Sequence, residues 1–137
     1  MTCVFCEIIS GDTPGHILHR DEHVICFLSL EGHPLVVPIA HIPSLEKLHH
    51  EVGAAIFRSA KRVAQAVKSA TGCHGINLVL SDGEAAGQDV FHLHLHVKPR
   101  WVGDDIHLSW NNATAPNADR SALAIRLRHF LAKAPSG

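Results

Sequence analysis

The sequence predicts an α+β fold: a five-stranded, mostly antiparallel sheet with one long central helix and a C-terminal helix. Five short β-rich segments lie within the first hundred positions, and only one long helical pattern, residues 51–71, lies inside that run of strands. The 137 residues fit one domain, 1–137. We divide it into an N-terminal segment, 1–15, a central part, and a C-terminal loop and helix, 101–137.

Three strands are expected before the long helix. The turn signal GDTPG at 11–15 ends the N-terminal segment. The segments HILHRD and HVICFLSL then read as two strands that are joined by a tight turn at Asp21 and Glu22. The segment HPLVVPIAH is the third strand. Its two prolines indicate strand ends or a sheet edge, because proline has no N–H to donate to a ladder.

The long helix follows from apolar residues that recur every three or four positions, namely Val52, Ile56, Ala60, Val63 and Val67. Gly72 fits the position that ends such a helix. A strand at 75–80, a loop at 81–89 and a histidine-rich strand follow, and we expect the helices to lie on one side of the sheet. The final helix is predicted by a second amphipathic pattern, formed by Leu123, Leu127, Phe130 and Leu131.

The composition excludes several classes of function. A formal net charge of −1 gives no basic field for nucleic acid, and 5% aromatic residues give few platforms for stacked bases. No apolar run approaches the roughly 18 residues that a membrane span needs. The N-terminus lacks the cationic and apolar regions of a signal peptide. We therefore expect a cytoplasmic protein with neither a nucleic-acid nor a membrane partner.

The segment FHLHLHVKPR carries His92, His94 and His96 at strict alternation. Alternate side chains of a strand share one face, so the three imidazoles should stand about 7 Å apart along it. The residues expected to pack under the helix are Phe91, Leu93, Leu95 and Val97.

Three interpretations of these histidines stay open: an exposed face that is rich in histidine, a catalytic metal site, and nucleophilic catalysis by an imidazole. Gly83 and Gly87 flank a loop just before the strand, and such loops offer backbone N–H groups to anions. A phosphate held there would lie beside His94, which favours the nucleophilic interpretation.

Cys3 and Cys6 have C-x-x-C spacing, which is half of a zinc site. Two small buried residues or a redox pair would show the same spacing. A structural zinc ion needs two further nitrogen or sulfur ligands in a tetrahedron.

The stretch GINLVLSDGEAAGQDVFHLHLHVKPR resembles the signature of the histidine triad (HIT) family, His-φ-His-φ-His-φ-φ with φ apolar, and departs from it at Lys98. The resemblance, which is to the bacterial type, extends through HPLVVPIAHI and CVFC and covers most of residues 3–100. It implies a HIT-like α+β fold in which two subunits join their sheets across a homodimer. It also implies hydrolysis or transfer at the α-phosphate of a purine nucleotide, through a covalent nucleotidyl-histidine.

Carried over residue by residue, the resemblance makes His94 the nucleophile and His96 a donor to a phosphoryl oxygen. No catalytic metal is then required. The expected substrate-binding positions are Gln88, Asp89, Val90, His33, Ser29 and Ser81. Some relatives complete a structural zinc site with two histidines, so the resemblance implies zinc on Cys3, Cys6, His41 and His92. The segment 1–15 is then the metal-binding segment.

Three positions depart from the family pattern. Ser29 stands near where relatives carry an Asp that holds the ribose, and the loop after it is shorter. Asp89 replaces a Ser, and an ionised carboxylate cannot donate a proton to a leaving group. Ser81 replaces an Asn. These changes motivate an alternative, a nucleotide-binding interaction module with weak or no catalysis. A third hypothesis is a metal-dependent hydrolase.

Overall fold

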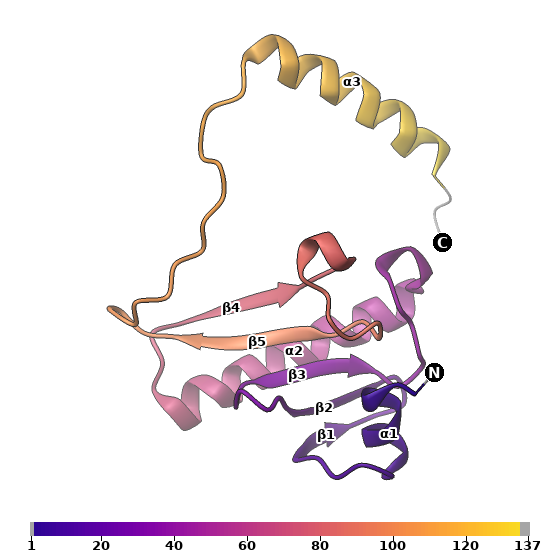
Figure 1. Ribbon diagram of the computed structural model, residues 1–137, viewed down its shortest axis with the longest axis vertical. Coiled ribbons are helices and arrows are strands. Elements are labelled where there is room, and N and C mark those ends of the chain that lie inside the picture. The colour runs from indigo at the N-terminus through magenta and orange to yellow at the C-terminus, as the bar shows by residue number, and fades with distance from the viewer. Residues whose placement is uncertain (1, 135–137) are drawn as a thin grey trace. The chain divides into compact units, whose positions relative to one another are not determined.

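The computed structural model describes residues 2–134, which form two compact units that divide between Asp104 and Asp105. The first unit contains one five-stranded sheet in which every neighbouring pair of strands is antiparallel (Figure 1). The strand order is β1-β2-β3-β5-β4. The strands are β1 (Ile17–Arg20), β2 (Val24–Leu28), β3 (Pro34–Pro38), β4 (Gly75–Leu80) and β5 (Leu95–Arg100). This sheet confirms the predicted fold class.

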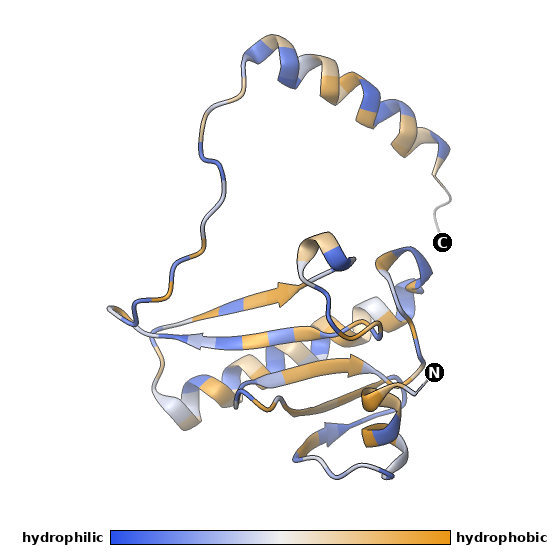
Figure 2. Ribbon diagram, viewed as in Figure 1, coloured by the Kyte–Doolittle hydropathy of each residue, from blue (hydrophilic) through white to orange (hydrophobic). Residues whose placement is uncertain are grey.

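The long helix α2 (His50–Thr71) covers one face of the sheet. Its buried apolar face packs against Val24 and Cys26 of β2. These two side chains point to the same side of the sheet because they are two residues apart. The helix ends as predicted, with Gly72 in a left-handed conformation (φ 68°) and its N–H donating to the Lys68 carbonyl. Figure 2 shows that apolar residues dominate the central strands β2 and β3.

A short helix, α1 (Val4–Ser10), lies on the opposite face, where Ile25 and Phe27 of β2 point. The expectation that all helices lie on one side of the sheet is therefore wrong. Seven residues are too few to show a helical period, so only the pair of cysteines marked this segment. The helix begins after Cys3, whose sulfur accepts a hydrogen bond from the Cys6 N–H.

The histidine strand begins later than predicted. The chain bends at residues 90–92, residues 93 and 94 have no regular structure, and β5 begins at Leu95, which pairs with Val36 of β3. Before that point the Leu93 N–H donates to the Ile42 carbonyl, beyond the end of β3, so the chain is held outside the regular ladder. Phe91 is 52% exposed, so the prediction that it packs under the helix is wrong.

The second unit contains helix α3 (Asn117–Lys133), preceded by residues 105–116 without regular structure. The predicted C-terminal helix is thus present, and it buries none of its described residues. Two further single-turn helices, η1 (Leu45–Lys47) and η2 (Glu84–Ala86), lie in loops of the first unit. Within residues 2–134 no helix is both long and apolar enough to cross a membrane.

Candidate functional site

The side chain of His92 is fixed by the end of strand β3. Its Nε2 lies 2.7 Å from the Pro38 carbonyl oxygen in a buried hydrogen bond. A carbonyl only accepts, so the ring proton is on Nε2 and the lone pair on Nδ1 faces the opposite side of the ring. Burial lowers the pKa of His92, which favours the neutral form that binds metals.

Nδ1 of His92 faces three other ligand atoms. It lies 3.5 Å from the sulfur of Cys3, 3.5 Å from the sulfur of Cys6 and 3.3 Å from Nδ1 of His41. The four ligand atoms all lie within 4.8 Å of one another. The predicted ligand set, which is separated by up to 89 positions in the sequence, is therefore brought together.

The spacing of these atoms fits a tetrahedral ion. With Zn–S of about 2.3 Å and Zn–N of about 2.05 Å, a tetrahedron has edges of roughly 3.5 Å between S and N and roughly 3.3 Å between two N atoms. The observed separations match both values, including 3.4 Å between the Cys6 sulfur and Nδ1 of His41. Cys3, Cys6, His41 and His92 could therefore hold a metal ion.

Phe5 connects this cluster to the next histidine. It lies between the two cysteines on α1, and its ring packs edge-on against Phe27 at 5.4 Å and against His94 at 4.9 Å between centroids. Apart from the position of Phe5 inside the C-x-x-C motif, no sequence pattern indicates this role. An ion bound to Cys3 and Cys6 would hold α1 in place, and with it the Phe5 ring that packs against His94.

The backbone of His92 orients the ring of His94. Nδ1 of His94 lies 2.8 Å from the His92 carbonyl oxygen, so Nδ1 carries the proton and Nε2 carries the lone pair. The residue is only 5% exposed. Among the described residues, every fully buried side-chain nitrogen has a hydrogen-bond partner. Nε2 of His94 has none among them, so this atom is not fully buried and reaches the surface. This nitrogen is placed as a nucleophile requires.

His96 lies against His94 and is hydrogen-bonded to His33. The centroids of the His94 and His96 rings are 4.9 Å apart, closer than the expected 7 Å, and His94 lies just before the strand and not in it. Nε2 of His33 and Nδ1 of His96 are 2.8 Å apart. Burial and the neighbouring His94 lower the pKa of His96 to about 4, so its ring is neutral near pH 7.

This shift predicts how stability depends on pH. Between pH 6.5 and about 4, the unfolded chain protonates His96 and the folded protein does not, so stability falls as the pH falls through this window. Each such proton changes the free energy of unfolding by about 1.4 kcal/mol per pH unit. We expect His96→Asn to have a shallower loss than the wild type in urea melts at pH 7 and pH 5. Equal slopes for His96→Asn and a control, His107→Asn at an exposed position, would contradict this.

The loop before the histidines is closed by the buried side chain of Gln88. Its Oε1 accepts from the Gly83 N–H at 2.7 Å, and its Nε2 donates to the carbonyl oxygens of Pro43 and Val90. Gly83 and Gly87 both have φ of 94°, a conformation that favours glycine. The side-chain amide of Gln88 therefore shapes the loop from within.

The remaining predicted substrate positions lie at the rim. The carboxylate of the exposed Asp89 accepts a hydrogen bond from the Val90 N–H at 2.9 Å, so this backbone N–H is already paired. Ser29 forms a tight turn with His33, in which its N–H donates to the His33 carbonyl at 2.8 Å and its Oγ accepts from the His33 N–H at 3.2 Å. Ser81 is half-buried where β4 leads into the loop.

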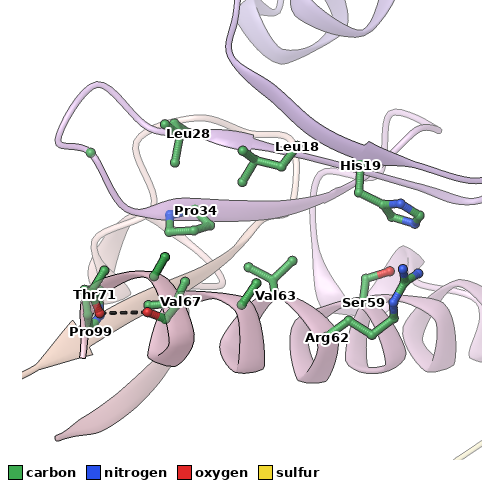
Figure 3. Close-up of a pocket in the computed structure, with 13 residues that line it drawn as sticks. Leu18, His19, Leu28, Pro34, Ser59, Arg62, Val63, Val67, Thr71 and Pro99 are labelled. Atoms are coloured by element: carbon green, nitrogen blue, oxygen red, sulfur yellow. Dashed lines mark hydrogen bonds between the residues drawn. The ribbon is translucent and has the colours of Figure 1, made fainter. Parts of the chain in front are cut away.

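A cavity of about 510 Å³ lies elsewhere in the described chain. It lies between α2 and the β1–β2 side of the sheet, on the face opposite His94, and none of the predicted site residues lines it. Figure 3 shows Val63 and Val67 of α2 facing Leu18 and Pro34 across it.

Comparisons with known proteins agree with the geometry. The family model of the HIT domain matches residues 10–101. "Protein hit" of Bacillus subtilis is 37% identical over 113 residues, 79% of this chain and 78% of that protein. "Adenylylsulfatase HINT3" of Arabidopsis thaliana is 39% identical over 102 residues, 72% of this chain and 52% of that protein. The crystal structure of a Zn-bound histidine triad family protein from Mycobacterium smegmatis superposes with a TM-score of 0.73 at 35% identity, covering 93% of this chain and 92% of that one.

Proposed function

Because this chain belongs to the histidine triad (HIT) family, we propose that it is a hydrolase or transferase acting on the α-phosphate of purine nucleotides through His94. The observation that carries the proposal is the hydrogen bond from Nδ1 of His94 to the His92 carbonyl. It fixes the ring tautomer and leaves an accessible lone pair on Nε2. A neutral imidazole with this orientation is a competent nucleophile at phosphorus.

In the proposed reaction, Nε2 of His94 attacks the α-phosphorus, and the bond to the leaving group breaks with its electron pair. A nucleotidyl-histidine with a P–N bond results. Water then attacks the phosphorus, the P–N bond returns its electrons to Nε2, and the nucleoside monophosphate is released. Transfer follows when another nucleophile replaces water.

His96 and His33 assist this step as a pair. We propose that His33 donates its Nε2–H to Nδ1 of His96, which places the His96 proton on Nε2. That N–H then donates to a phosphoryl oxygen, where negative charge grows in the transition state. In the loop at 83–87 the N–H groups of Gly83, Ala86 and Gly87 are already paired, so the loop would contact a phosphoryl oxygen through the backbone N–H groups of residues 84 and 85.

The metal site has a structural role in this proposal. Cys3, Cys6, His41 and His92 would hold zinc, which supplies no chemistry to the reaction and ties α1 to the end of β3. His92 then serves the ion through Nδ1 and orients His94 through its carbonyl oxygen.

The covalent intermediate tests the proposal. Intact-mass measurement should find an adduct of one nucleoside monophosphate after incubation with a panel of adenylyl and guanylyl donors, and peptide mapping should place it on His94. Turnover without such an adduct on any donor would contradict it. Bound nucleotide with neither adduct nor turnover would favour the interaction module, which the occupation of the Val90 amide by Asp89 also supports.

We also propose a homodimer in which the β4 edge of the sheet is shared. β4 ends the sheet, so one side of this strand lacks a neighbouring strand within the described chain. Beside it, Leu78 of β4 and Phe57 of α2 line an apolar groove and are 43% and 63% exposed. Pairing of this edge with a second copy of the chain would give the unpaired backbone N–H and C=O groups of β4 hydrogen-bond partners. It would also cover the side chains of Leu78 and Phe57.

Phe57→Glu is expected to convert the dimer to a monomer, because the interface loses the apolar area of the Phe57 ring and must desolvate a carboxylate, even with Lys61 and Lys68 in the same groove. Light scattering after size-exclusion chromatography measures the mass. The control, Leu18→Glu, places the same charge on β1 at the opposite edge and should leave the dimer intact. An unchanged dimer in Phe57→Glu would place the interface elsewhere.

A further inference from the structure

The cavity between α2 and the sheet, here called the α2 cavity, follows one face of the helix over about three turns. Its sheet side includes Leu28 and Pro34, which Figure 3 shows facing the helix. Most of its lining is therefore apolar. The helix side includes residues of one face, namely Ser59, Arg62, Val63, Ala66, Val67 and Ala70.

One end of the α2 cavity holds a polar side chain without a partner. Ser59 is only 3% exposed, and its hydroxyl forms no hydrogen bond with the described residues. Every fully buried side-chain oxygen among those residues has a partner, so Oγ of Ser59 is not fully buried and opens into the cavity. Figure 3 shows this oxygen pointing towards the sheet. At the other end, the hydroxyl of Thr71 donates to the Val67 carbonyl at 2.7 Å.

Arg62 brings a positive charge to the same end as Ser59 (Figure 3). Its guanidinium forms no hydrogen bond or ion pair with residues 2–134. Burial and then the Asp21 carboxylate raise the pKa of the Cys26 thiol to about 11, and the charge of Arg62 opposes them. Arg62 is therefore close enough to β2 to act on a thiol that is buried between the helix and the sheet.

The other charged groups near this end are already paired. The carboxylate of Asp21 accepts from the N–H groups of His23 and Val24, both at 2.9 Å, and lies 3.6 Å from Nε2 of His19. Arg62 and Ser59 thus remain as donors without an acceptor. A guanidinium fork beside a hydroxyl matches the two oxygens of a carboxylate.

The size of the α2 cavity favours a small molecule over a segment of protein. The distance from Ser59 to Ala70 along the helix is about 16 Å, so a volume of about 510 Å³ leaves a mean cross-section of about 32 Å². A helix with its side chains is about 10 Å across and needs roughly 80 Å². An extended alkyl chain is narrower and advances about 1.3 Å per carbon, because its C–C bonds of about 1.5 Å alternate in direction.

We propose that the α2 cavity binds a carboxylate with a linear alkyl chain of about ten to twelve carbons, a medium-chain fatty acid. Arg62 and Ser59 donate to the carboxylate. The alkyl chain lies along α2 against Val67 and faces Leu28 and Pro34 of the sheet, where it is removed from water. The site is on the face opposite His94, and the proposal does not rest on the proposed function.

Isothermal titration calorimetry with decanoate tests this site without turnover. We expect the wild type to bind one decanoate per chain. Arg62→Met should lower the affinity about 10- to 100-fold, because the carboxylate loses its charged donor, and Ser59→Ala should lower it about threefold to tenfold. Decan-1-ol has the same alkyl chain without the charge, so the wild type and Arg62→Met should bind it equally.

The matched control is Arg58→Met, which removes an exposed arginine of α2 that does not line the cavity. Its affinity for decanoate should change less than about threefold, since exposed charges are screened by solvent. Ala66→Leu narrows the middle of the cavity and should weaken decanoate and decan-1-ol alike, by about tenfold or more. Ala66 is exposed, so the fold should persist, and thermal melting checks this.

Failure of the wild type to bind decanoate, or equal affinities of Arg62→Met and Arg58→Met, would overturn the proposal. Binding of several decanoate molecules per chain that Ala66→Leu leaves unchanged would also overturn it, because that is adsorption of a detergent to the surface. His94→Ala should bind decanoate like the wild type, so the outcome for this site is independent of the outcome for the proposed reaction.

Discussion

Replacing His94 with alanine is expected to lower turnover about ten-thousand-fold or more, since the bond-forming atom is removed. The fold should survive. The imidazole is held by one backbone carbonyl and by ring contacts with Phe5 and His96, and its loss leaves only a small space beside α1. Steady-state assays on the donor panel give the rate, and circular dichroism with thermal melting gives the fold.

The control for this experiment is His107→Ala, which removes an exposed imidazole from the second unit. It should turn over like the wild type and carry the adduct. His94→Gly should bind nucleotide and carry none. If His94→Ala kept wild-type turnover, the assignment of His94 as the nucleophile and the proposed mechanism would both be wrong, whatever the geometry of the neighbouring histidines.

Loss of the metal is expected to have the largest effect on stability. Cys6→Ser should lower the thermal midpoint by about 15 °C relative to zinc-loaded wild type. His41 and His92 are far from the two cysteines along the chain and meet them only after folding, so an ion binds the native state preferentially. Without it, α1 loses its anchor and the Phe5 contact with His94 loosens.

Metal analysis by mass spectrometry should find one zinc ion per chain in the wild type and much less in Cys6→Ser. Cys73→Ser, at a half-buried thiol outside the cluster, should retain both the metal and the melting temperature. Identical melting of Cys6→Ser and Cys73→Ser would refute the structural role. Protein that is treated with a chelator and is still folded should form the His94 adduct. Its complete loss there would favour a metal-dependent hydrolase.

Much of the fold was predictable because its signals are local. The α2 stripe and the stop at Gly72 follow from helical period and glycine geometry, and both are found in the structure. The bend at 90–92 and the late start of β5 were not predictable, since alternating His and apolar residues also describe a regular strand. A hydrogen bond from Leu93 to Ile42, 51 positions away, determines where the ladder begins.

The sequence by itself determined the family signature, the C-x-x-C pair and which residues are able to bind a metal or attack phosphorus, because these depend on residue type and spacing. Only the tertiary structure decided the role of each ring nitrogen. The proton of His92 is placed by the Pro38 carbonyl, 54 positions away, and that of His94 by a carbonyl that the bend turns towards it. Acceptors of this kind belong to the backbone, which every residue carries, so no side-chain pattern identifies them before the chain has folded.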